Sequence, residues 1–147
     1  MSDSQKFPVA AHALAYLAYW GAMSPEKAAP SARIAASMPT NPVVVRRVTA
    51  QLARAGLIGS RPGARGGAWL TRPPEEITLE QVLRAVGGCA QFGCPPPGVK
   101  ACPVGARIPA AVGRAIAAAD AAAAKRLSSI TVADLLDGET RLPATAA

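Results

Sequence analysis

The chain lacks the groups that enzymes most often use for catalysis. Aromatic residues make up only 4% of its 147 residues, and it has a single histidine, His12, in an apolar stretch. No acidic residues cluster beside its three cysteines. Because a catalytic nucleophile needs a nearby base and a group that orients it, we expect that the chain is not an enzyme and assign no catalytic residue.

Long hydrophobic runs are also missing. The first apolar run, Pro8–Trp20, is 13 residues long, which is too short to span a bilayer, and no cationic leader precedes it. We therefore expect no membrane contact, no export and a cytoplasmic location. Three cysteines in a reducing compartment favour ligands or redox sensors over structural disulfides.

Acidic residues and lysines are absent from one long stretch, residues 33–72, which instead holds seven arginines. The nine basic residues elsewhere balance the nine acidic ones, so the formal net charge of +7 belongs to this window. An arginine-only surface on an otherwise neutral body is suited to a polyanion, and nucleic acid is the expected partner. The seven are Arg33, Arg46, Arg47, Arg54, Arg61, Arg65 and Arg72.

What is present predicts a mainly α-helical fold with one small β-hairpin. A buried helix is expected over Pro8–Trp20, a loop over 21–30 and a short helix from Ser31 to Met38. A tight turn follows, in which Asn41 is a good N-cap and Pro42 suits the first helical position of a helix that runs to Ala55. Two helices joined by such a turn predict a helix-turn-helix, with arginines on the second helix.

A basic hairpin follows the second helix. Strands are expected over Leu57–Ser60 and Ala68–Thr71, with an arginine-bearing tip, 61–67, between them. A hairpin of this kind directly after a recognition helix is a wing. The predicted fold class is therefore a winged helix-turn-helix domain with a long C-terminal helix.

The second half of the chain divides into unlike segments. A capping box at Thr78 opens a helix to Val86, and the Gly/Pro-rich stretch 87–105 contains the cysteines. An alanine-rich helix then starts at Pro103 or Pro109 and ends at Leu127, and a second capping box at Thr131–Asp134 starts a short last helix that ends at Gly138. We expect a DNA-binding domain over 1–86, a sensor loop over 87–105, the long and final helices over 106–138, and a disordered tail over 139–147.

Several blocks of the sequence resemble one family, the Rrf-type winged-helix transcription regulators that include IscR, NsrR and CymR. They begin with Thr-Asn-Pro-Val-Val-Val-Arg-Arg at 40–47, and continue through Gly66-Gly67 to the Pro-x-Glu-Glu-Ile-Thr-Leu block at 73–79. The Cys-Pro-Val-Gly block at 102–105 is most similar to the YwnA-like branch. The resemblance implies a homodimer whose dimerisation helix is the alanine-rich one, and a palindromic double-stranded DNA operator.

The expected DNA contacts follow from position. Arg46 and Arg47 lie near the start of the recognition helix, where side chains reach the major groove, and Val44 offers a methyl surface for thymine. Thr40 and Asn41 are suited to phosphate contact, although capping competes for Asn41. The wing arginines, Arg61 and Arg65, are expected in a minor groove.

The cysteines leave the signal open. The resemblance implies either an iron–sulfur cluster, with Cys89, Cys94 and Cys102 as ligands and His12 as a candidate fourth, or a cluster-free thiol switch. The seven-residue gap before Cys102 is longer than in the cluster-binding members, and the YwnA-like branch keeps only the last thiol. A helix start favours the Cys102 thiolate, so redox or electrophile sensing is our first expectation.

These observations predict a DNA-binding regulator of transcription, with repression as the expected mode. Its affinity for the operator would be switched by cysteine chemistry, and the alternative signal is nitric oxide, redox or iron status sensed through a cluster. A third hypothesis, from another class, is a basic structural nucleic-acid-binding module without a switch. Such a module has the same arginines but has no use for the cysteine loop.

Overall fold

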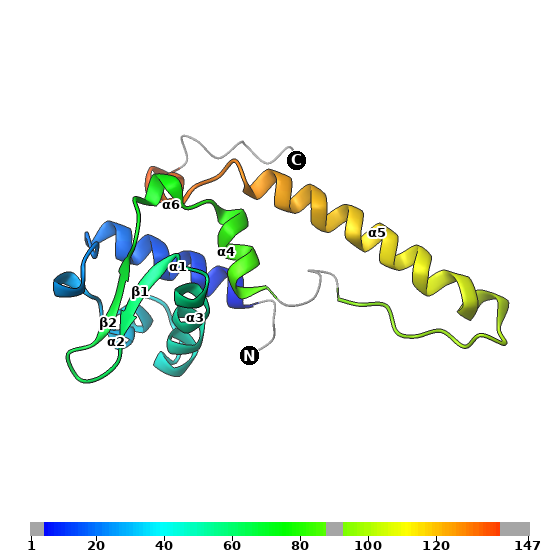
Figure 1. Ribbon diagram of the computed structural model, residues 1–147, viewed down its shortest axis with the longest axis horizontal. Coiled ribbons are helices and arrows are strands. Elements are labelled where there is room, and N and C mark those ends of the chain that lie inside the picture. The colour runs from blue at the N-terminus through cyan, green and yellow to red at the C-terminus, as the bar shows by residue number, and fades with distance from the viewer. Residues whose placement is uncertain (1–4, 88–92, 139–147) are drawn as a thin grey trace.

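Helix α1, Lys6–Tyr19, lies at the centre of the structure, which is a computed structural model that describes residues 5–87 and 93–138 (Figure 1). Its apolar side chains are fully buried at Ala10, Ala13, Leu14 and Leu17. Helices α3, α4 and α6 all pack against it. The chain thus forms the predicted helical body around one alanine- and leucine-rich core.

The helix-turn-helix consists of α2, Ser31–Ala36, and α3, Pro42–Arg54. The turn between them ends at Asn41, whose side-chain Oδ1 accepts a hydrogen bond from the Val43 amide at 2.8 Å. This confirms the predicted cap, which satisfies one of the amides that a helix start leaves without a partner. α2 is two residues shorter than the pattern predicted.

The wing is an antiparallel hairpin of β1, Ile58–Arg61, and β2, Gly67–Leu70. Each strand is shifted by one residue from the prediction. The preceding loop, 21–30, is more ordered than expected, because it contains the 3-10 turn η2, Pro25–Lys27, and adds a bridge between Ala29 and Ala68. A Cβ on Gly67 would lie 2.6 Å from the Ala29 carbonyl, so glycine lets the loop backbone approach the wing this closely.

Two short elements close the body. The 3-10 turn η3, Pro74–Glu76, leads into α4, Leu79–Val86, and the predicted capping box of Thr78 and Gln81 forms. Helix α6, Val132–Leu136, begins with a second predicted capping box and packs on α1 and η3. Backbone hydrogen bonds join the Val132 amide to the Ile77 carbonyl and the Leu79 amide to the Ile130 carbonyl.

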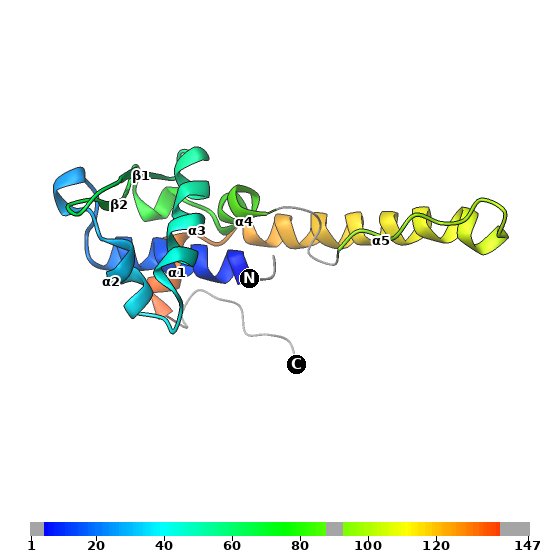
Figure 2. The ribbon, with the colours of Figure 1, turned by 90° about the horizontal axis from the view of Figure 1, so that it is seen from below.

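The final helix therefore shares the core of the N-terminal body, although the sequence grouped it with the long helix. Val132 is fully buried within that core. The intervening α5, Pro103–Leu127, extends away from the body, and both views show that its C-terminal end lies next to α4 while its N-terminal end projects (Figures 1 and 2). None of the 25 residues of α5 is buried.

Helix α5 begins at the earlier of the two starts that the sequence allowed. Pro109 lies inside the helix and has no amide hydrogen to donate to the Gly105 carbonyl. Gly98 approaches this carbonyl so closely that a Cβ there would overlap the oxygen. No helix in the described part of the chain is long and apolar enough to cross a membrane.

The buried position of Val132 gives a first prediction. Val132→Ala should lower the free energy of unfolding by about 1–3 kcal/mol, because it removes two buried methyl groups from the shared core. Leu136→Ala, at a side chain that is 39% exposed on the same helix, should cost less than about 1 kcal/mol. Urea unfolding followed by circular dichroism measures both. Equal losses would contradict the assignment of α6 to the core of the body.

Candidate nucleic-acid interface and cysteine arm

The arginines of the 33–72 window lie on the helix-turn-helix and the wing. All except Arg72 are exposed: Arg33 on α2, Arg46, Arg47 and Arg54 on α3, and Arg61 and Arg65 on the wing. Within residues 5–87 and 93–138, the recorded ion pair joins Arg84 to Glu80 and involves none of them. Their charges are therefore available to an external anion.

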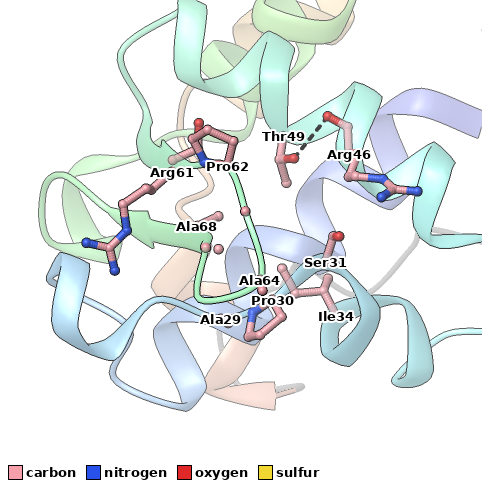
Figure 3. A pocket seen from close by; sticks show the side chains of 14 residues that line it. Ala29, Pro30, Ser31, Ile34, Arg46, Thr49, Arg61, Pro62, Ala64 and Ala68 are labelled. Atoms are coloured by element: carbon pink, nitrogen blue, oxygen red, sulfur yellow. Dashed lines mark hydrogen bonds between the residues drawn. The ribbon is translucent and has the colours of Figure 1, made fainter.

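A pocket of about 450 Å³ separates the recognition helix from the wing (Figure 3). Its floor is apolar, with Ile34 and Ala68, and hydroxyl groups of Ser31, Ser60 and Thr49 line it. Arg46 and Arg61 lie on opposite sides, and Figure 3 shows both guanidinium groups pointing outward from the pocket. A hollow with cationic rims and hydroxyl donors can accept one strand of a sugar–phosphate backbone.

The recognition helix presents the predicted arginines to solvent. Arg46 and Arg47 are exposed near the N-terminal end of α3, where HTH proteins contact base edges. Val44 is half-buried and lines a cavity of about 310 Å³ against Pro8 and Val9 of α1. The neighbouring Val43 is 42% exposed and therefore presents more apolar surface to solvent than Val44 does.

Thr40 and Asn41, the two predicted phosphate contacts, each form a hydrogen bond within the protein. The Thr40 amide donates to the Met38 carbonyl at 2.7 Å, which leaves its hydroxyl rather than its amide to contact phosphate. The Asn41 oxygen is occupied by the cap, so its amide nitrogen is the group that it can offer. Both residues stay at the edge of the arginine surface, where the turn meets α3.

Sequence reasoning missed several residues of this surface. Ser31, Thr49 and Ser60 line the pocket, but they come from three different elements and form no sequence motif. Thr49 is the buried polar residue of α3, and its hydroxyl donates to the Arg46 carbonyl at 3.1 Å. Glu26, on η2, is an acid that lies outside the arginine window in sequence but close to Arg61 in space.

The segment 93–102, which we call the cysteine arm, runs back along the exposed end of α5 (Figures 1 and 2). Pro95 packs against the position of Gly113, and Gly98 packs against Gly105. Cys102 caps the helix start. Gly113 comes eleven positions after Cys102, which corresponds to roughly 16 Å along the helix axis. Because Cys94 is the neighbour of Pro95, it lies at about the same distance from Cys102.

The local geometry activates Cys102. Backbone amides of Gly105 and, to a smaller extent, Val104 donate to its sulfur and lower the pKa of the thiol. The Gly105 nitrogen lies 3.5 Å from Sγ. Both Cys102 and Cys94 are exposed. The predicted preference for thiolate at Cys102 thus has its cause in the amides at the start of α5.

The described residues do not by themselves assemble a ligand set for an iron–sulfur cluster within one chain. Cys94 and Cys102 are too far apart to ligate one cluster, and Cys89 lies outside the described residues. His12 is exposed on α1, where its Nε2 hydrogen-bonds to the Ser37 hydroxyl at 2.8 Å, linking α1 to the end of α2. No group of three metal-ligating side chains assembles within residues 5–87 and 93–138.

A helix-turn-helix with an arginine surface and a basic hairpin defines a winged-helix DNA-binding protein. The family model described as "Rrf2: Iron-dependent Transcriptional regulator" matches residues 3–138. The chain belongs to the Rrf2 family, whose members are DNA-binding transcriptional regulators and not enzymes.

Individual relatives support this assignment. YwnA of Bacillus subtilis (strain 168), named as an HTH-type transcriptional regulator, is 35% identical over 105 residues, which cover 71% of this chain and 78% of YwnA. A crystal structure named as a DNA-binding protein is 32% identical and covers 89% of this chain and 98% of its own, with a TM-score of 0.66. Staphylococcus aureus CymR in its oxidized form shares the fold, with 24% identity, a TM-score of 0.61 and coverage of 92% and 95%.

The amides at the start of α5 make the relative reactivity of the thiols predictable. Near neutral pH, Cys102 should react with iodoacetamide several-fold faster than Cys94, since more of it is thiolate. As the pH rises above the ordinary pKa of a thiol, both side chains become thiolates and this advantage should disappear. Mass spectrometry of the labelled peptides measures the two rates. In denaturant, where the helix amides no longer donate, the two thiols should react alike; a difference that persists there would contradict the helix-start explanation.

Proposed function

We propose that this regulator is a repressor that binds a palindromic DNA operator as a homodimer, and that thiol chemistry at Cys102 lowers its affinity. The observation that supports DNA contact through this surface is the set of exposed arginines on α2, α3 and the wing, which form no direct ion pair with the acids that the structure describes. Repression is the simplest mode, because a protein that occupies a promoter needs no contact with polymerase. Such a protein acts in the cytoplasm, where the DNA lies.

The interface divides the task between reading and positioning. In this proposal, α3 enters the major groove with Arg46 and Arg47, while the wing reaches the adjacent minor groove with Arg61 and Arg65. One DNA strand passes over the pocket between them, where the Ser31 and Ser60 hydroxyls can donate to phosphate oxygens. Arg33 and Arg54 extend the positive surface toward flanking phosphates.

The exposed face of α5 is the proposed dimer interface. Val104, Ile108 and Val112 are 65%, 50% and 42% exposed and follow one another at four-residue spacing, so they lie on one side of the helix. α5 is about 38 Å long and projects beyond the body that would otherwise cover it (Figure 1). A second copy can cover this apolar stripe, and a two-fold axis then places two recognition helices about one DNA turn apart.

Cys102 is the proposed sensor because it is an exposed, activated thiol beside this stripe. Its thiolate can attack a peroxide and keep one oxygen as a sulfenic acid while the other leaves as hydroxide or alkoxide. Electrophiles would be captured by the same sulfur. Either product removes the anionic cap from the start of α5, next to Val104 in the proposed dimer interface. Cys94 is too distant to form a disulfide with Cys102 in this conformation.

Removal of the recognition-helix arginines tests the DNA-binding surface. Arg46→Ala or Arg47→Ala should weaken binding to the promoter fragment upstream of the protein's own gene by about 1–3 kcal/mol. Arg114→Ala, an exposed arginine on α5, should leave binding nearly unchanged. Fluorescence anisotropy with labelled duplex measures the affinities. Binding without preference for the promoter fragment would instead favour the structural-module hypothesis.

The switch is tested with reduced and peroxide-treated protein. Peroxide should weaken operator binding at least tenfold in the wild type, while Cys102→Ser should bind equally tightly before and after treatment; Cys94→Ser is the matched control and should respond like the wild type. Footprinting of the same promoter fragment checks both. Anaerobic purification followed by visible absorption separates the alternative, because brown protein that contains iron and sulfide would favour cluster-dependent sensing over a thiol switch.

A further inference from the structure

The wing is fastened to a segment that sequence analysis treated as a plain loop. The Leu70 amide donates to the Ala22 carbonyl at 2.8 Å, and Ala29 exchanges two backbone hydrogen bonds with Ala68, at 2.8 and 2.9 Å. Between these ties, η2 packs against both β1 and β2. Residues 22–29 therefore form a fixed side wall of the wing rather than an independent loop.

This wall brings a carboxylate to the arginine-rich surface. Glu26 lies in η2 and is exposed. The pKa of its carboxyl lies below its usual range because of the Ser24 hydroxyl first, its own backbone amide second, and the positive charge of Arg61 as a smaller contribution. The 33–72 window holds no acid of its own, so the fold supplies an anion from outside the window, on an element that packs against the strand of a wing arginine.

The orientation of Arg61 agrees with this electrostatic pairing. Its guanidinium donates to the Arg65 carbonyl at 3.3 Å, and Figure 3 shows that it points away from the pocket and toward the side of the wing where the turn before α2 lies. Arg46, across the pocket, points in the opposite direction (Figure 3). Arg61 is thus held at the outer edge of the wing, and η2, which carries Glu26, packs against the strand β1 that bears Arg61.

We propose that Glu26 is a positioning and specificity-determining residue, an internal anion that competes with DNA for Arg61. This inference depends on the DNA-binding function proposed above. Arg61 exchanges the carboxylate for DNA most readily where the negative potential is strong, as in a narrow A·T-rich minor groove. On DNA with a wider groove the weaker potential leaves Arg61 with the Glu26 carboxylate. Loss of the carboxylate therefore gains the full pairing free energy on A·T-rich DNA and only the weaker Arg61–DNA contact on other sequences, so Glu26 reduces the preference for A·T-rich sites.

The test uses the full-length chain and two labelled duplexes of about 30 base pairs, one with A·T tracts and one G·C-rich, near 50 mM salt, where exposed charges are weakly screened. Glu26→Gln should tighten binding to the A·T duplex about two- to fivefold and to the G·C-rich duplex less. The discrimination between the two duplexes therefore rises. Glu75→Gln, which removes the same charge from an exposed position on η3, should change neither affinity.

A double-mutant cycle with Arg61→Ala decides whether the two residues act as a pair. In the Arg61→Ala background, Glu26→Gln should give no further gain. An equal gain in both backgrounds, an equal gain on both duplexes, or no gain over Glu75→Gln would each overturn the proposal. Wild-type protein that binds neither duplex would instead overturn the proposed DNA-binding function.

A measurement without DNA separates these failures further. The titration midpoint of the Glu26 carboxyl, followed by NMR, should rise in Arg61→Ala, because removal of a nearby cation disfavours the carboxylate. It should stay unchanged in Arg114→Ala, which removes a cation from α5. A midpoint that does not respond to Arg61→Ala would overturn the pairing whatever the DNA result.

Discussion

Burial of α1 is the constraint that positions everything else in this protein. Its small and branched apolar side chains pack on α3, α4 and α6. One helix therefore positions both the recognition helix α3 and the helix α4, on which α5 packs. Alanine at Ala10 and Ala13 lets neighbouring helices approach closely, which explains how a core with few aromatic residues can be tightly filled. The DNA surface and the cysteine arm are therefore carried by one shared scaffold.

The exposed arginines on α2, α3 and the wing give this scaffold its proposed DNA-binding surface. The exposed arginines contribute little to folding, since surface charges are well solvated, but they set the charge that a partner meets. Glu26 modifies this field at one point, beside Arg61, where the fold rather than the sequence brings an acid to the wing. In our proposal, attraction to DNA and discrimination among DNA sequences thus depend on different residues of the same surface.

Local signals explain what the sequence could predict. Asn41, Thr78 and Thr131 cap helices through contacts within three residues, and the structure confirms each cap. Long-range contacts explain what it could not: η2 is held against the wing by partners more than 35 residues away, and α6 packs on α1 across most of the chain. The same limit applies to the site, because spacing cannot reveal that the cysteine arm holds Cys94 far from Cys102.

The attachment of α5 at one end only has a mechanical consequence. Contacts with α4 and the docking of α6 hold the C-terminal end, whereas the end that bears Cys102 is joined to the body through the cysteine arm. Because only the C-terminal end of α5 is held, a rotation of about 5° at this end moves the N-terminal tip, about 38 Å away, by about 3 Å. Conversely, a small force applied at the tip exerts a large torque where the helix meets the body, so in the proposed homodimer a chemical event at Cys102 would change the angle between the two DNA-binding units.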